Sequence, residues 1–184
     1  MMKHLFLRIA FVAIGVILLL TVAYKWLNTS FDSLAVAKSH YQEAPTPIDR
    51  SAENQTPVFI EGFTAYREQN WEEAITALDE VDVSNPSYSE ARYFLGHAYY
   101  QHGQYEKAAT VFQILALTRD VRFEEDADWY RVICLLAAQA DQSSLLIALQ
   151  PILAKENHAY YQEALQLRGK IRGFAWRLAN GTTN

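Results

Sequence analysis

The sequence repeats itself at an interval of 34 residues, and this periodicity constrains the fold more than any other feature. Gly96 follows Gly62 at that spacing, and the residues around the two glycines match as well. The other matching pairs are Ile60 and Phe94, Tyr66 and Tyr100, Trp71 and Tyr105, Glu72 and Glu106, Ala74 and Ala108, and Leu78 and Phe112. A fixed period of this length indicates a stack of similar units, each burying its apolar face against a neighbour.

The glycines and small residues predict two helices joined by a turn in each unit. Gly103 is placed to end the first helix of the second unit, since a left-handed residue costs least at glycine. Gly96 lacks a side chain, so the second helix of the unit can approach it closely, with Ala108 as the small residue that faces it. Tyr99 and Phe112 are then expected to fill the contact between neighbouring units.

The second unit resembles the tetratricopeptide repeat, because Leu95, Gly96, Tyr99, Ala108 and Phe112 stand at the spacing of that family. Arg92 takes the place of the usual first tryptophan. A weaker third unit places Trp129 at an offset of 37 from Arg92 and Ile133 where the glycine was. Pro151 should kink or end the second helix of that unit.

The resemblance implies an all-α fold, a short tetratricopeptide-like α-solenoid, and the apolar N-terminal run predicts a separate transmembrane helix. Three helix-turn-helix units are expected within residues 55–157, at about 55–88, 89–122 and 126–157. Residues 158–184 are expected to form a capping helix and tail. The apolar stripe proposed for this cap consists of Ala164, Leu167, Ile171, Phe174, Ala175 and Leu178.

The first thirty residues differ from the rest, because Leu5 to Tyr24 gives twenty residues interrupted only by Arg8. About 20 residues of helix cross the hydrocarbon layer of a bilayer. The alternative is a cleaved signal peptide, whose apolar region usually has about 7–15 residues with a small-x-small site close behind. The nearest such tripeptide, at 35–37, lies far downstream, so the sequence favours an uncleaved anchor over residues 1–27.

Charges around the apolar run predict its orientation. Lys3 and Arg8 precede or begin the run, whereas Lys25 and then Asp32 follow it. Because positive charge favours the cytoplasmic side, we expect a single-pass protein of the inner (plasma) membrane with a cytoplasmic N-terminus and repeats on the periplasmic or outer side. Residues 28–54 are polar and contain prolines, which predicts a tether, with one short helix near Phe31–His40.

The resemblance also implies a binding surface, because the first helix of each such unit lines a concave groove. The alternative is that several of these side chains pack between helices or under the tether. Aromatic residues and arginine are enriched in binding hot spots. The candidate partner-binding residues on these helices are Phe59, Phe63, Tyr66, Tyr93, His97, Tyr100, Tyr130 and Arg131.

Other classes of function find little support in the sequence. The net charge of −5 argues against a nucleic-acid binder. His97 and His102 do not share a helix face, and Cys134, in an apolar segment, is expected to be a buried hydrophobe rather than a nucleophile. We therefore expect no enzyme activity, no catalytic or metal-binding residues, no cofactor and no small-molecule substrate.

Two hypotheses follow for the function of the whole chain. The first is a membrane-anchored scaffold, or an assembly or chaperone-like accessory factor, that binds a protein partner through the aromatic groove. The second is a structural subunit of a larger membrane complex that uses its transmembrane helix and its repeats for docking. The last 30 residues are rich in basic side chains, which is typical either of a solvated face or of a surface that orients a partner or the membrane.

Overall fold

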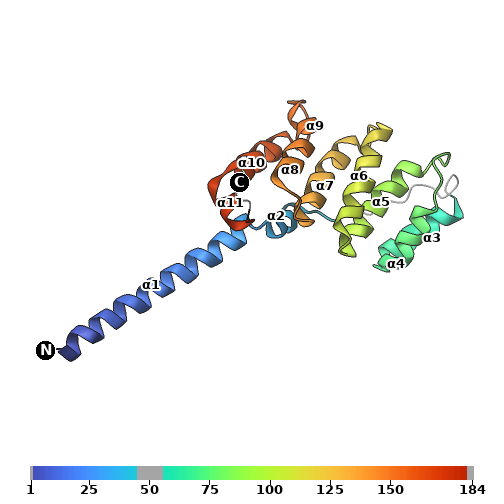
Figure 1. Cartoon of the computed structure of the whole chain (residues 1–184). Helices are drawn as coiled ribbons and strands as arrows, with labels where there is room; N and C mark the ends of the chain where they lie inside the picture. Colours follow the sequence, from blue (N-terminus) through green and yellow to red (C-terminus); the bar gives the residue numbers. More distant parts are fainter. Residues whose placement is uncertain (1, 45–55, 182–184) are drawn as a thin grey trace.

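The computed structural model describes residues 2–44 and 56–181, and every regular element in that part of the chain is a helix. One long helix projects from a row of shorter, packed helices (Figure 1). The elements are α1 (Met2–Phe31), α2 (Ser33–His40), α3 (Pro57–Arg67), α4 (Trp71–Asp79), α5 (Tyr88–Gln101), α6 (Tyr105–Thr118), α7 (Glu124–Ala137), α8 (Gln142–Ala148), α9 (Gln150–Leu153), α10 (Tyr161–Arg172) and α11 (Phe174–Ala179). This architecture agrees with the predicted all-α, solenoid-like fold.

Helices α3 to α8 form three pairs, α3–α4, α5–α6 and α7–α8, and the turn inside each pair is built in the same way. The residue with positive φ is Gln69, Gly103 or Gln139, at φ values of 61°, 77° and 55°. In each turn its amide donates to the carbonyl three residues earlier, and the next amide donates to the carbonyl five residues earlier. This pattern is the Schellman motif, which satisfies carbonyls at the end of a helix. The sequence predicted it at Gly103 and missed it at the two glutamines.

Two glycines set how closely the first two helix pairs approach. A Cβ atom added to Gly62 would lie 2.7 Å from Cγ of Leu78, and one added to Gly96 would lie 2.7 Å from Cζ of Phe112. The close approach predicted at Gly96 is therefore confirmed. The side chain over this glycine is Phe112 rather than the expected Ala108, although both are fully buried.

Arg92, which stands where the family usually has tryptophan, joins the first unit to the second. Its Nη2 atom donates to the carbonyl oxygens of Leu78, Asp79 and Val81 at 2.9–3.1 Å, and Nη1 donates to the Asp79 carboxylate at 2.8 Å. The carbonyls of Leu78 and Asp79 lie in the last turn of α4, and that of Val81 lies two residues beyond it, where carbonyls lack the regular partners of a helix interior. A buried guanidinium at this position also complements the negative end of the helix dipole.

The third unit ends as its proline predicted, but the cap differs from the expected single helix. Helix α8 ends at Ala148, and Pro151 lies in the first turn of α9. The cap consists of α10 and α11, separated at Gly173, whose backbone is extended at φ −69° and ψ 154°. Because of this break, α11 turns a different set of side chains toward the protein body than a continuous α10 would. Trp176 is therefore buried, whereas Phe174 and Leu178 are exposed. The predicted apolar stripe is therefore wrong beyond Ile171.

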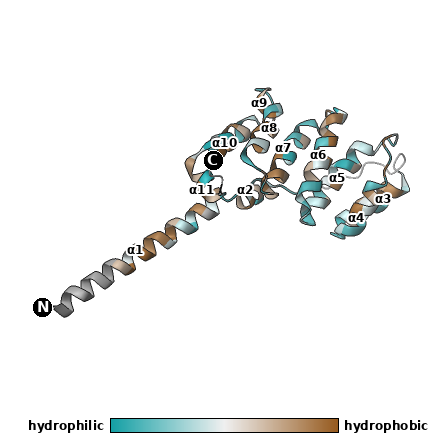
Figure 2. Cartoon of the chain, viewed as in Figure 1, coloured by the Kyte–Doolittle hydropathy of each residue, from teal (hydrophilic) through white to brown (hydrophobic). Residues whose placement is uncertain are grey.

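Helix α1 is longer than the expected anchor and continues without interruption to Phe31. The segment Ala13–Phe31 is long and apolar enough to cross a membrane, by length and composition (Figure 2). Its large apolar side chains, from Ile14 to Trp26, are exposed in the isolated chain. An apolar helix with so little packing of its own is the form that a membrane anchor takes, and a signal sequence has the same composition.

Residues 33–44, here called the strap, are not a free tether. Asp32 caps α2 by accepting a hydrogen bond from the Ala35 amide at 2.8 Å. Helix α2 then packs against α7, and Val36 and Ala37 are buried in that contact. The short helix predicted near these residues is present, but the expectation of a tether over 28–54 is wrong for the strap, because α2 has an apolar face too short to recognise in sequence. Residues 45–55 lie outside the described part of the chain.

The contact at Gly96 gives a direct test of the helix pairing. Gly96→Leu should lower the free energy of unfolding by about 1–3 kcal/mol or more, because the new side chain overlaps the Phe112 ring. The measurement is chemical unfolding of the full chain in detergent, followed by circular dichroism.

Gly169→Ala is the matched control, since nothing lies within 4 Å of a Cβ at that helical position. Replacing a helical glycine with alanine there should raise stability by about 0.5–1 kcal/mol. Equal stability of the Gly96→Leu variant and the wild type would show that the two helices are not in close contact.

Candidate functional site

The first helices of the three pairs, α3, α5 and α7, carry the aromatic residues predicted to line a groove, and the strap lies over the same face. Tyr41, which directly follows α2, enters this aromatic cluster. Its ring stacks on Tyr100 of α5, with 3.8 Å between centroids and 8° between planes, and meets Tyr130 of α7 edge-on at 5.9 Å. The strap therefore places its own aromatic side chain between the second and third units.

The Tyr41 hydroxyl also makes a polar contact with the groove. It lies 2.9 Å from Nδ1 of His97. Burial lowers the pKa of His97 to about 3, so the imidazole is neutral at ordinary pH. A neutral imidazole accepts through one nitrogen and donates through the other, and Tyr41, whose own pKa is raised by burial, is the donor here. Nδ1 of His97 is thus the acceptor, and Nε2 carries the proton.

Aromatic rings from three helices enclose the imidazole. The centroid of His97 lies 4.7 Å from that of Tyr93, 5.2 Å from that of Phe112 and 4.5 Å from that of Tyr130. All three contacts are T-shaped, the arrangement that aromatic quadrupoles favour. His97 is 0% exposed, so the groove beneath the strap is closed to water at its centre.

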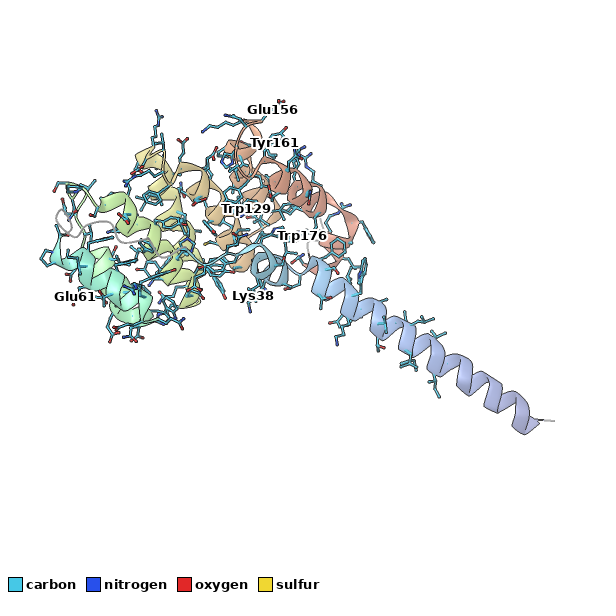
Figure 3. All side chains as sticks on the ribbon, turned by 180° about the vertical axis from the view of Figure 1, so that it is seen from behind. Lys38, Glu61, Trp129, Glu156, Tyr161 and Trp176 are labelled. Carbon is cyan, nitrogen blue, oxygen red and sulfur yellow. The ribbon has the colours of Figure 1, made fainter. Side chains whose placement is uncertain are left out.

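The strap helix extends this contact to the third unit and the cap. His40 meets Trp129 of α7 edge-on at 5.7 Å, and Trp129 stacks on Tyr160 at 5.1 Å. Lys38 on α2 and Trp129 on α7 mark the two sides of this contact in Figure 3. One turn before Trp129 on α7, Asp126 accepts hydrogen bonds from the hydroxyls of Tyr93 at 3.3 Å and Tyr160 at 2.7 Å. The carboxylate therefore links the second unit to the segment that precedes α10.

The first unit contributes a separate group of rings at the other end of the face. The ring centroids of Phe63 and Tyr66 of α3 lie 4.8 Å and 5.1 Å from the ring centroid of Phe94 of α5. Phe59 packs beside Phe63 and is fully buried. Burial, followed by the nearby Glu43 carboxylate, raises the pKa of Tyr66. Glu43 belongs to the strap, so the strap extends from α7 across the face toward α3.

The candidate residues lie on α3, α5 and α7, but most of them are not exposed. Phe63 and Arg131 are partly exposed. The other six are buried, namely Phe59, Tyr66, Tyr93, His97, Tyr100 and Tyr130. The expectation of an open surface is wrong at Tyr66, His97 and Tyr100, because the strap covers the groove. Sequence reasoning missed Tyr41, whose only signal was an aromatic residue just after the short helix in a polar segment.

Among the residues that the structure describes, three polar atoms of the groove find no hydrogen-bond partner while the strap is in place. They are the hydroxyl oxygens of Tyr66 and Tyr100 and Nε2 of His97. A buried polar group without a partner costs about 1–3 kcal/mol of free energy. The strap thus fills the groove with apolar surface and leaves part of its hydrogen-bonding capacity unused.

Other surfaces offer less for recognition or chemistry. Glu61, Glu72, Glu73 and Glu80 surround a shallow depression on α3 and α4. Cys134 is fully buried, as expected, and burial raises the pKa of its thiol, which keeps the sulfur protonated.

His97 makes the stability of the groove dependent on pH. In the unfolded chain the pKa returns to about 6.5, so between pH 6.5 and pH 3 the unfolded state binds a proton that the folded state does not. The free energy of unfolding should therefore fall as the pH drops, by about 2 kcal/mol from this residue between pH 7 and pH 5. Urea unfolding at the two pH values measures the loss.

His97→Asn should lower stability at both pH values but remove most of this dependence. His102→Asn is the control, because His102 is a partly exposed histidine just after the end of α5. A wild-type dependence equal to that of His97→Asn would contradict a buried, neutral imidazole.

Comparison with known proteins agrees with this geometry. A tetratricopeptide repeat family model matches residues 65–133, which run from the end of α3 through most of α7. No curated protein and no solved structure matches the chain significantly. Repeats of this family generally mediate protein–protein interaction and are generally not enzymes. Residues 65–133 are therefore similar to tetratricopeptide repeats.

Proposed function

We propose that the chain is a membrane-anchored protein-interaction scaffold whose aromatic groove receives a segment of a partner protein in place of the strap. The observation that carries this proposal is the strap itself. A short helix with a small apolar face packs against α7, and the tyrosine that follows it is inserted between α5 and α7. The groove is therefore suited to a peptide segment of that kind.

The unpartnered polar atoms explain how a partner competes with the strap. Within residues 2–44 and 56–181, the hydroxyls of Tyr66 and Tyr100 and Nε2 of His97 have no hydrogen-bond partner beneath the strap. A segment that fills the same volume and also supplies acceptors or donors to these atoms gains free energy that the strap does not obtain. That gain offsets part of the advantage that the strap has as a tethered, intramolecular ligand.

The geometry of the strap sets the chemistry expected of the partner. Val36 and Ala37 meet α7 with small side chains, and Tyr41 brings an aromatic ring with a polar end. We expect the partner segment to present a short helix with small residues on one face and an aromatic or polar side chain after it. Scaffolding and assisted assembly both fit such reversible exchange.

Membrane anchoring is the second part of the proposal. Helix α1 supports it by its length, its apolar composition and the exposure of the side chains from Ile14 to Trp26. Lys3 and Arg8 at the N-terminal side favour an N-terminus in the cytoplasm, with the repeats on the outer side of the membrane.

Anchoring predicts that the mature protein keeps residues 1–27 and stays with membranes after a carbonate wash. Intact mass spectrometry of the purified protein measures its N-terminus directly. A mature form that begins between Tyr24 and Lys38 would identify the apolar run as a cleaved signal and contradict the anchor.

The groove is tested with a photoreactive phenylalanine analogue in place of Tyr100 in the full chain, in its native membranes. Without a partner, the probe should crosslink to the strap, because Tyr100 stacks on Tyr41. Tyr41→Ala removes that stack and the hydrogen bond to His97, so crosslinks to a partner should increase several-fold. Tyr161→Ala is the matched control, since Tyr161 is a partly exposed tyrosine that begins α10.

A second probe at Leu117, exposed on α6, reports on a surface outside the groove. The groove would be contradicted if partner crosslinks formed only from the probe at 117 while the probe at 100 crosslinked to the strap in every variant. Binding would then lie elsewhere on the repeats.

A further inference from the structure

Helix α11 presents an apolar face that the rest of the chain does not cover. Phe174 and Leu178 are four residues apart, so they share one side of the helix. They are 73% and 60% exposed, whereas Trp176, on the opposite side, is 2% exposed and holds α11 against the body. Gly173 creates this arrangement, because its extended backbone ends α10 and sets a new helical phase.

Asn180, directly after α11, fixes this helix to the end of α1. Its Nδ2 atom donates to the carbonyl of Phe31, the last residue of α1, at 2.8 Å, and also to the carbonyl of Trp176 at 2.9 Å. Its Oδ1 atom accepts from the amide of Ser33, the first residue of α2, at 3.1 Å. Figures 1 and 3 show the result, with α11 beside the end of α1 and Trp176 at their junction.

The aromatic residues of α1 place this junction at the surface of a bilayer. Tyr24 and Trp26 are exposed, and the Trp26 ring meets the Phe31 ring at 5.5 Å. Tryptophan and tyrosine concentrate at the membrane–water interface. Five residues of helix rise about 7.5 Å, which is close to the thickness of one headgroup layer. An aromatic belt that begins at Trp26 therefore ends near the level of Phe31 and α11.

The charges around α11 also suit a position at the surface of a bilayer. Arg172 and Arg177 are exposed on either side of Phe174, and Nζ of Lys170 lies 5.8 Å from the centre of the Phe31 ring. The nearby carboxylate of Asp32 is engaged by the Ala35 amide as a helix cap. Basic residues that flank an apolar helix face are typical of a segment that lies on anionic lipid headgroups.

We propose that α11 is a membrane-surface contact, with Phe174 and Leu178 among the lipid headgroups and Arg172 and Arg177 paired with lipid phosphates. The contact rests on the anchoring proposed above and adds a second attachment point to it. One helix alone leaves the repeats free to rotate and tilt about its axis. A second contact, joined to the first through Asn180, holds the repeat stack in one orientation relative to the membrane.

The test places a fluorescent probe on single cysteines in the full chain, reconstituted into phosphatidylcholine vesicles with added anionic phosphatidylglycerol. Cys134 stays in place, because its buried thiol does not react in the folded protein. The probe is attached at Leu178→Cys, and Phe174→Cys serves as a second reporter on the same face. Val121→Cys, on the exposed loop between α6 and α7, is the control position.

Probes at residues 174 and 178 should emit at shorter wavelength, be quenched by lipids that carry a nitroxide on the headgroup, and be protected from iodide. The probe at 121 should emit at longer wavelength, escape quenching by the headgroup nitroxide and be quenched by iodide. Arg172→Gln with Arg177→Gln should reduce the headgroup quenching in anionic vesicles to the level found in pure phosphatidylcholine. Full access of iodide to residues 174 and 178 would overturn the proposal.

A further label at Leu19 separates this proposal from the anchor on which it depends. Leu19 is exposed in the middle of the apolar run, so lipids with a nitroxide on the acyl chain should quench it. Quenching at 19 without protection at 174 and 178 would disprove the surface contact and leave the anchor intact. No quenching at 19 would contradict the anchor itself.

Discussion

The close approach of paired helices at Gly62 and Gly96 is the constraint on which the rest of the structure depends. At each glycine an added Cβ would overlap the residue from the second helix, Leu78 in one unit and Phe112 in the next. Because the same contact recurs at the same place, the first helices of successive units lie side by side and share one face. The three turns support this, since each closes with the same pair of backbone hydrogen bonds around a left-handed residue. The aromatic groove exists because these local contacts repeat.

The groove and the strap pack against each other. The rings of Tyr100, Tyr130 and His97 form a site that a single tyrosine fills, and Tyr41 comes from a segment only ten residues beyond the end of α1. A contact between the strap and the groove therefore also connects the apolar helix to the repeats. If a partner replaces the strap, it changes the link between the repeats and the anchor as well as occupying a surface. Under the proposed function, binding in the groove and the position of the repeats relative to α1 are coupled through the same twelve residues.

Asn180 contributes the second connection between the anchor and the repeats. Its side chain binds the end of α1, the start of α2 and the end of α11 at once. The apolar helix is thus held at its junction by hydrogen bonds that do not involve the groove. Release of the strap near Tyr41 need not release this junction. The contact of Tyr41 with the groove and the hydrogen bonds of Asn180 are therefore two separate connections between the N-terminal helices and the rest of the chain.

The sequence alone determined the period, the helix pairs and the apolar N-terminal helix, because these depend on spacings along one chain segment. Because glycine has no side chain, Gly62 and Gly96 allow the close approach of paired helices, and Gly103 allows the left-handed turn. The sequence also indicated which aromatic residues lie on equivalent helices of the repeat. Only the tertiary structure decided that this face is covered. The strap is short, its apolar side consists of a few residues such as Val36 and Ala37, and its partner helices lie far along the chain. Likewise, the extended backbone at Gly173, which turns Phe174 outward and Trp176 inward, arises from packing against α1 and the third unit, and a helical periodicity cannot reveal it.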